Sequence, residues 1–479
     1  MAVTGVETDD SEPTGDTGGL KQSLKQRHMN LIALGGTIGA GLFVGSGVII
    51  HDAGPAAFIS FAIAGVIITL VIRMLAEMTV AKPALGSFYV YAREGLGRRA
   101  GFAVGWMYWY FWVIVVAVEA VAGGRILQLW VPAAPLWVLC LVLMGLLTCT
   151  NLISARSFGE FEYWFSGIKI VAIVVFLVVG VAYLFGLWPN SVGGLANLTA
   201  NGGVAPMGLG AVFAAVVPCI AFYTGAEIVT IAAAESSQPR QAVAKATNSI
   251  ILRVLLFYVG SVFIIVAIRP WNSPDITVSP YAAALQALNV PAVSTLMNAV
   301  VLVAVLSALN SSLFTSSRMI FALTRNGDAP QLFTKLSASG VPRRAILLGT
   351  TAGYVSVIFA FISPDLVFSF LVNSYGAVAL FVYFCIALAQ VRMRRRLDAE
   401  HFPFTLKMWF FPWLSYATIA LMAAVLVTMA ILPATRSQFW LSLVTLAVIL
   451  IIYEVHRRKH PEGDKRTEGA PTGTRSAAG

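Results

Sequence analysis

About twelve long apolar runs, separated by short loops, make up most of this sequence, and each is near the ~20 residues that an α-helix needs to cross a bilayer. Only 11% of the 479 residues are charged, against about 25% in a soluble globular protein. We therefore expect an all-α polytopic membrane protein. The expected spans are approximately 30–51, 56–80, 101–125, 135–154, 162–186, 209–233, 249–268, 294–323, 345–362, 365–390, 411–432 and 437–456.

Basic residues lie in alternate loops. Lys25 and Arg27 precede the first run, Arg98 and Arg99 follow the second, and a cluster of arginines follows the tenth. The loop at 187–209, on the opposite side, has no charged residue. The positive-inside rule then predicts that both termini face the cytoplasm. This placement accounts for the net charge of +10 without a nucleic-acid partner.

The expected organisation is a disordered cytoplasmic N-terminus over 1–24, a transmembrane domain over 25–456 and a disordered cytoplasmic tail over 457–479. The four cysteines lie inside apolar runs without the spacing of a metal site or a disulfide framework, so we expect small buried residues. No cluster of His, Cys or Asp indicates metal or nucleophilic chemistry. We therefore expect no metal, no cofactor and no enzyme activity.

Glycine-bearing interruptions occur in two of the runs, GGTIGAGLF at 35–43 in the first and FYTGAEIV at 222–229 in the sixth. Lipid cannot satisfy the backbone groups that a broken helix leaves unpaired, so such a break must line a cavity or be packed in protein. Matched breaks in two halves of a chain indicate a transporter's binding site. The alternative for the first break is close helix packing through small residues.

The runs divide into two units of similar length, about 29–186 and 208–390, and each unit opens with a broken run. Since each unit has an odd number of spans, the second must insert inverted relative to the first. This predicts an inverted repeat, the usual basis of alternating access. Two extra helices at about 411–456 fall outside the repeat.

The first break can bind an anionic group. Glycine permits a non-helical backbone and a close approach by a ligand, and the break contains Gly35, Gly36, Gly39 and Gly41. A half-helix that starts there directs N–H groups and a partial positive charge at a carboxylate.

The second break can supply the facing half of the site. Thr224 and Gly225 allow unwinding, and the carbonyls freed there can accept from an ammonium. Phe222 and Tyr223 can line the cavity, although aromatics at this spacing are also typical of plain core.

Three charged residues lie inside expected spans, where charge is costly and usually functional. Glu119 can face a substrate ammonium or relay a proton, or serve as a structural partner. Glu227 follows the second break and can instead bind its orphan N–H groups. Lys169 can exchange a proton or occupy the place of a sodium ion, unless it extends to the nearby membrane interface.

Several ordered motifs resemble the amino-acid permeases of the amino acid–polyamine–organocation superfamily, and the resemblance covers about 20–456. They are GGTIGAGLFVGSG, RMLAEM, GSFYVYA, FGEFEYWF, TGAEIVTIAAAES and ALNSSLFTSSRMIFAL. Within the family, YWYFWVIVVAVEA, VPAAPLW and AEIVTIAAAES look most similar to bacterial γ-aminobutyrate permeases. Ala308 departs from the cysteine expected there in the closest of these, so the substrate stays open.

The resemblance implies a LeuT-like 5+5 inverted repeat with helices 1 and 6 broken, in a bacterial plasma membrane. It implies proton-coupled uptake of an amino acid, with γ-aminobutyrate favoured. It assigns Lys169 to proton coupling. The substrate-binding residues expected from the motifs and from Glu119 are Thr37, Ile38, Gly39, Ala40, Gly41, Glu119, Phe222, Tyr223, Thr224, Gly225 and Glu227.

Other functions stay open at this stage. Another neutral, aromatic or basic amino acid could be the substrate, and sequence does not separate exchange from symport. A channel would be expected to show a filter or a charged ring, and a nutrient sensor a sizeable soluble output domain; neither is seen in the sequence. The expected partners are the substrate, protons and the lipid bilayer, with the oligomeric state undetermined.

Overall fold

The computed structural model describes residues 24–36, 38–39, 41–189, 195–236, 238–290, 292–362, 377–433 and 435–459. These residues are helical apart from turns, loops and one isolated β-bridge between Leu24 and Ser236. Eight helical stretches among them are long and apolar enough to cross a membrane. The all-α prediction is confirmed for this part of the chain.

Residues 365–376 of the expected tenth span lie outside the described residues. The described parts of the expected spans contain helices. In chain order these are α1 (Gln26–Gly35), η1 (Gly41–Gly45), α2 (Ser46–Ala53), α3 (Ala57–Ala81), α5 (Arg98–Gln128), α6 (Leu136–Ile153), α7 (Ala155–Leu184), α9 (Gly208–Phe222), α10 (Ile228–Ala232), α11 (Pro239–Arg253), η4 (Val254–Gly260), α12 (Ser261–Ile268), α15 (Val293–Arg325), α16 (Arg343–Ile362), α18 (Val378–Ala399), α19 (Trp413–Ile431) and α20 (Arg436–Lys459). Shorter elements connect them: η2 (Gly54–Ala56), α4 (Phe88–Leu96), α8 (Asn197–Ala200), η3 (Ala233–Glu235), α13 (Pro274–Val278), α14 (Pro280–Ala287) and η5 (Gln331–Thr334).

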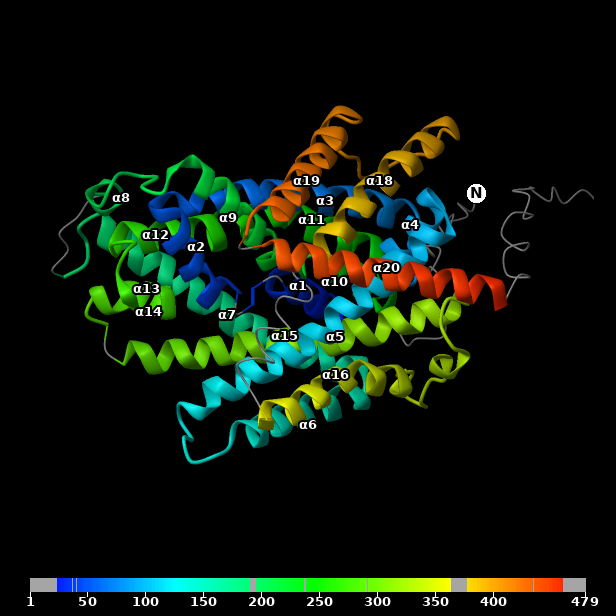
Figure 1. Cartoon of the computed structure of the whole chain (residues 1–479), viewed down its shortest axis with the longest axis horizontal. Coiled ribbons are helices and arrows are strands. Elements are labelled where there is room, and N and C mark those ends of the chain that lie inside the picture. The colour runs from blue at the N-terminus through cyan, green and yellow to red at the C-terminus, as the bar shows by residue number, and fades with distance from the viewer. Residues whose placement is uncertain are drawn as a thin grey trace, which may run out of the picture.

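Figure 1 shows an elongated bundle with α8, α13 and α14 at one end and α4 at the other. The long helices α5 and α15 run between these ends and pack against each other. Both also contact α16, which pairs with α6 on one side of the bundle. On the other side, α19 packs on α18 and α20.

Side chains on the outer helices are apolar and exposed. Val142 on α6 is 59% exposed, Val178 on α7 is 63% exposed and Ile451 on α20 is 64% exposed. Large apolar surfaces of this kind are exposed in water only at a cost, because burial of apolar surface is the main favourable term in folding. These helix faces therefore suit contact with lipid.

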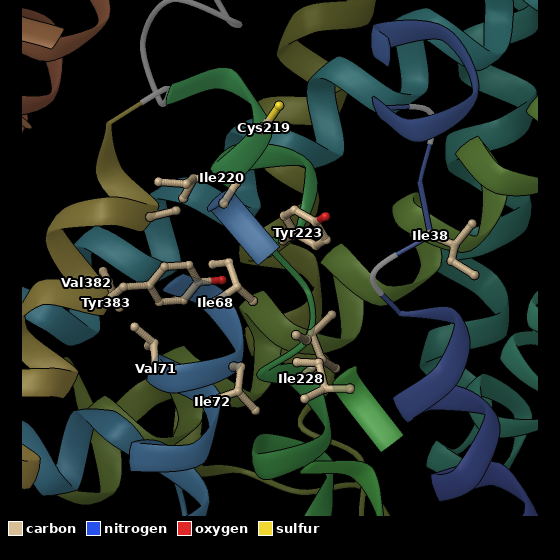
Figure 2. Close-up of a cluster of buried hydrophobic side chains, with 14 of the residues drawn as sticks. Ile38, Ile68, Val71, Ile72, Cys219, Ile220, Tyr223, Ile228, Val382 and Tyr383 are labelled. Atoms are coloured by element: carbon tan, nitrogen blue, oxygen red, sulfur yellow. The ribbon is translucent and has the colours of Figure 1, made fainter. Parts of the chain in front are cut away.

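The interior is apolar and surrounds the two breaks. Figure 2 shows Ile68, Val71 and Ile72 of α3 in one cluster with Tyr223, which lies just after α9, and Tyr383 of α18. All five side chains are buried. The second break is thus packed in protein, as an unwound segment at membrane depth must be.

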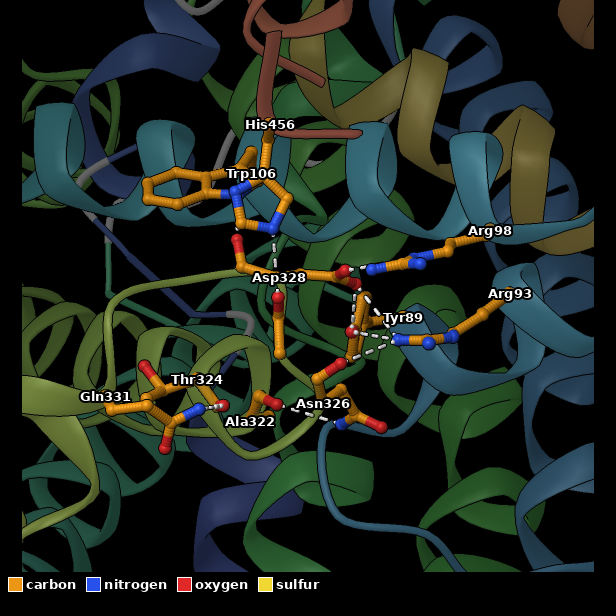
Figure 3. Close-up of polar contacts among 11 residues, drawn as sticks. Tyr89, Arg93, Arg98, Trp106, Ala322, Thr324, Asn326, Asp328, Gln331 and His456 are labelled. Atoms are coloured by element: carbon orange, nitrogen blue, oxygen red, sulfur yellow. Dashed lines mark hydrogen bonds and ion pairs between the residues drawn. The ribbon is translucent and has the colours of Figure 1, made fainter. Parts of the chain in front are cut away.

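A buried polar cluster joins α4 to the loop that follows α15 (Figure 3). The Asp328 carboxylate is fully buried, accepts a hydrogen bond from the Tyr89 hydroxyl at 2.6 Å and pairs with Arg93 at 3.1 Å. The His456 ring of α20 lies 3.1 Å from the Gly327 carbonyl oxygen of the same loop. A buried carboxylate of this kind requires such partners, and they fix the α4 end of the bundle.

The cysteines follow the prediction in part. Cys140 and Cys219 are buried and Cys385 is partly buried. The expectation is wrong for Cys149, which is exposed on α6. Cys149 lies on a face of α6 that the described residues leave exposed, a feature that hydrophobicity alone does not reveal.

Candidate functional site

The first break separates α1 from the π-helical turn η1. Between them, the Ile38 amide donates to the Gly35 carbonyl at 3.0 Å, and the Leu42 amide donates to the Gly39 carbonyl at 3.2 Å. The Ile38 side chain is buried. The expected site residues Thr37 and Ala40 lie outside the described residues. The predicted interruption is present and falls where the glycines are.

Lys169 of α7 binds this break directly. Its ammonium donates to the Gly35 carbonyl at 2.7 Å, to the Ile38 carbonyl at 2.7 Å and to the Ser307 hydroxyl of α15 at 2.8 Å. These bonds use all three of its N–H donors. The residue is 1% exposed, so the alternative in which it extends to the membrane interface is wrong.

The ligands around Lys169 are those of a cation site. Two main-chain carbonyls and a hydroxyl are oxygen ligands, which hard cations prefer. The ammonium also interacts electrostatically with the carboxylates of Glu162 and Glu119. Lys169 therefore supplies the positive charge that holds the unwound carbonyls of the first break in place.

Glu162 of α7 is a site residue that the sequence analysis missed. Its Oε1 accepts from the Ser307 hydroxyl at 2.6 Å and from the Ser166 hydroxyl at 3.0 Å. The side chain is fully buried. A signal was present, because this glutamate precedes Lys169 by seven residues, about two helical turns, and so lies on the same face of α7.

The second break separates α9 from α10. Gly225 within it has φ +114°, a conformation that side chains rarely adopt. Its amide donates to Glu227 Oε2 at 3.1 Å. The hydroxyls of Tyr108 and Tyr383 donate to Oε1 and Oε2 of Glu227, each at 2.8 Å. The geometry favours the alternative in which Glu227 binds the orphan N–H of the break.

The two breaks contact each other through their backbones. A Cβ added to Gly225 would lie 2.3 Å from the Gly36 carbonyl oxygen, and a Cβ added to Gly36 would lie 3.3 Å from the Gly225 carbonyl oxygen. Such separations leave no room for a side chain on Gly225. The glycines that the sequence marks in two distant runs are therefore neighbours in space.

Phe222 and Tyr223 have different surroundings. The Phe222 ring covers η1, where a Cβ on Gly41 or on Gly45 would approach it to 2.5 Å, and it stacks on Phe61 with ring centroids 6.3 Å apart. Tyr223 is 1% exposed and donates its hydroxyl to the Phe61 carbonyl at 3.0 Å. Phe222 is thus the aromatic of the pair that is partly exposed beside the breaks, and Tyr223 packs in the core.

Glu119 of α5 is partly buried, and its Oε2 is shielded from solvent without a hydrogen-bond partner among the described residues. A buried carboxylate oxygen in this state is costly unless a donor or cation approaches it. It interacts with the Lys169 ammonium through space. This oxygen can therefore accept a further hydrogen bond.

The structure brings together most of the expected site residues that it describes. The contacts above join Gly41 to Phe222 and connect the first break to Lys169, with Glu119 nearby. Thr224 and Gly225 lie in the second break, and Gly225 lies against Gly36. Ser307 and Glu162 join this group, although the sequence analysis assigned neither to the site. Among the described residues, no group of three or more His, Cys, Asp or Glu could hold a metal ion.

Comparison with known proteins identifies the family. The family model described as amino acid permease matches residues 28–465. The γ-aminobutyric acid permease of Bacillus subtilis (strain 168) is 49% identical over 443 residues, covering 92% of this chain and 94% of that protein. A probable GABA permease of Pseudomonas aeruginosa is 46% identical over 94% of this chain and 96% of its own length. The γ-aminobutyric acid permease of Escherichia coli (strain K12) is 44% identical over 87% of this chain and 90% of its own length. A match of this extent, on a chain whose apolar helices enclose two broken spans, means that this protein belongs to the amino acid permease family.

Proposed function

We propose that this permease imports γ-aminobutyrate, or a related ω- or neutral amino acid, by proton symport. The substrate assignment rests on the three similar permeases, each of which is named for γ-aminobutyrate. The proposed location is the bacterial cell membrane, with both termini in the cytoplasm, as the basic loops favour.

The substrate carboxylate binds at the first break. The helix formed by η1 and α2 starts at Gly41, and the first N–H groups of a helix have no partner within it. The Leu42 amide already donates to the Gly39 carbonyl outside the helix. The carbonyls of Gly35 and Ile38 are already bound by Lys169, so the break favours an anion at its N–H side. The proposed backbone ligands are residues 37–41, and residues 222–225 form the facing wall.

The substrate ammonium is directed toward Glu119. This carboxylate has a buried oxygen without a hydrogen-bond partner among the residues that the structure describes. Glu227, in contrast, has both oxygens bound by tyrosine hydroxyls. We therefore assign the ammonium to Glu119 and a supporting role at the second break to Glu227.

Lys169 carries the proton coupling. The observation that supports this most is the hydrogen bonding of its ammonium to the carbonyls of the first break. Loss of a proton from this nitrogen removes its positive charge and one of its three donors. The hydrogen bonds from Lys169 to the Gly35 and Ile38 carbonyls then weaken. The protonation state of one side chain thereby controls the geometry of the half-helix that binds substrate.

The proposed architecture is a LeuT-like 5+5 inverted repeat followed by two extra helices, twelve spans in total. The support is the position of the breaks, each in the first span of its unit, and their contact at Gly36 and Gly225. Alternating access follows if one unit moves against the other around this contact. Residues 363–376, at the start of the expected tenth span, lie outside the described residues.

Two alternatives differ in substrate or coupling. The protein could carry another neutral, aromatic or basic amino acid, or exchange one amino acid for another. A sensor without transport is disfavoured, because the three similar proteins are all named as permeases.

Uptake into proteoliposomes tests the proposal. We expect radiolabelled γ-aminobutyrate to accumulate when the outside is more acidic, and unlabelled ω-amino acids to compete better than aromatic or basic ones. Uptake that ignores the pH gradient would refute symport. Failure of γ-aminobutyrate to compete with a transported amino acid would refute the substrate assignment alone.

A further inference from the structure

We propose that Glu162 is the proton acceptor for Lys169 and that the Ser307 hydroxyl relays the proton between them. The inference rests on the proposed symport, in which Lys169 is the group that gains and loses a proton. It adds the route by which that proton leaves.

A directional chain of hydrogen bonds links the three side chains. The Lys169 ammonium donates to Ser307 Oγ at 2.8 Å, and Ser307 Oγ donates its own proton to Glu162 Oε1 at 2.6 Å. Lys169 is 1% exposed, and Glu162 and Ser307 are also buried. A wire of short hydrogen bonds in a water-poor interior is the arrangement that proton transfer needs.

The competing acceptor near Lys169 is Glu119. It interacts with the ammonium through space, but the described residues show no hydrogen bond between the two. The other two ammonium donors are bound by the carbonyls of Gly35 and Ile38, which are not bases. The path through Ser307 is therefore the one that leads from Lys169 to a carboxylate.

The transfer conserves atoms and charge. One N–H bond of the Lys169 ammonium breaks and that proton binds Ser307 Oγ, while the original Ser307 O–H bond breaks and its proton binds Glu162 Oε1. The products are a neutral amine, an unchanged serine and a neutral carboxylic acid. No charge is left unpaired, which matters because an isolated charge at this depth is costly.

The direction of the wire suits release to the cytoplasm. Glu162 lies seven residues nearer than Lys169 to the start of α7, about 10 Å along the helix axis. The start of α7 faces the cytoplasm in the proposed orientation. The neighbouring charged groups are Glu160 on α7, and Arg27 and His28 on α1, which pair with Glu160. When the cytoplasmic side opens, the proton on Glu162 can leave toward this end of α7.

The test uses Glu162→Gln and Glu162→Asp in the full-length protein in proteoliposomes. Glutamine can still accept the Ser307 hydrogen bond but cannot take a proton. For one proton per substrate, a gradient of one pH unit supports about tenfold accumulation. We expect Glu162→Gln to lose this accumulation and the pH dependence of uptake. The same variant should keep exchange of internal for external substrate. Glu162→Asp should retain part of the accumulation.

Ser307→Ala tests the relay independently. It should lose accumulation as Glu162→Gln does. Ser312→Ala should not, because among the described residues the Ser312 hydroxyl bonds only the Ala308 carbonyl of its own helix. This control removes a buried hydroxyl from the same helix without interrupting the wire. If either test variant fails to fold, as judged by thermal unfolding in detergent, the other still decides.

The outcomes separate this inference from the proposed symport. Wild-type uptake that ignores the pH gradient would refute symport itself. If Glu162→Gln or Ser307→Ala still accumulates substrate in response to the pH gradient as the wild type does, the relay is overturned and symport stands. Loss of both accumulation and exchange in a folded Glu162→Gln protein would make Glu162 a structural residue and would also overturn the relay.

Discussion

Arg318 and Glu235 form a buried ion pair, with Arg318 Nε 2.6 Å from Glu235 Oε1 and Nη2 3.3 Å from Oε2. Their side chains are 2% and 1% exposed. The guanidinium also lies over the Phe314 ring, 4.0 Å from its centroid. The pair ties η3, which follows the second break and α10, to the long helix α15. The second break is thus fixed on both sides, by Gly36 within the core and by Arg318 beyond it.

Removing one member of this pair should be worse than removing both. Arg318→Met leaves the Glu235 carboxylate buried and unpaired, which costs about 3–5 kcal/mol. The double variant Glu235→Gln with Arg318→Met leaves no charge and should be less destabilised. Thermal unfolding of the purified protein in detergent compares them, and a double variant as unstable as Arg318→Met would contradict the argument.

Gly225→Ala should abolish most uptake. The residue has φ +114° and its Cβ would lie 2.3 Å from the Gly36 carbonyl oxygen. Backbone strain alone costs about 1–3 kcal/mol, and the clash adds to it by forcing the two breaks apart. Gly203→Ala is the matched control, because Gly203 has φ +87° with nothing within 4 Å of its Cβ. Initial uptake rates should fall for Gly225→Ala only. If both variants lose the same fraction of the uptake rate, backbone strain is the cause rather than contact between the breaks.

Gly45→Ala should impair uptake through Phe222. A Cβ there would meet the end of the Phe222 ring at 2.5 Å, and that ring also stacks on Phe61. Phe222→Leu, being smaller, makes room for the methyl group. The double variant should therefore recover uptake relative to Gly45→Ala, since residues in contact are not additive. A double variant that shows the sum of the two single losses would refute the contact as the cause.

The positions of the breaks could be predicted from sequence because their cause is local. Glycines inside an apolar run mark where a helix can unwind, and the structure places the interruptions between α1 and η1 and between α9 and α10. Lys169 could also be found, since a lysine inside an apolar span stands out. What it binds could not be predicted, because the Gly35 carbonyl is 134 residues away along the chain.

The residues that were missed owe their position to tertiary packing. The seven-residue spacing places Glu162 on the Lys169 face of α7, but its partner Ser307 comes from α15, and the second glutamate of the motif, Glu160, pairs with Arg27 of α1. Glu227 looked like a possible substrate ligand, yet Tyr108 and Tyr383, which bind its two oxygens, come from α5 and α18. Side-chain partners from distant helices decide these roles, and a single sequence does not contain that information.

Lys169→Gln should uncouple uptake from the proton gradient. Glutamine can still donate hydrogen bonds toward the Gly35 and Ile38 carbonyls, but it carries no charge and does not titrate. The variant should therefore bring labelled γ-aminobutyrate only to equal concentrations on both sides, at a rate that does not change with external pH. Lys335→Gln removes an exposed lysine after α15 and is the control for a lost positive charge. If Lys169→Gln accumulates substrate to the wild-type level, Lys169 is excluded as the coupling residue. Binding is measured separately, as protection by substrate against thermal unfolding. Loss of all binding would show that the ammonium is needed to shape the first break.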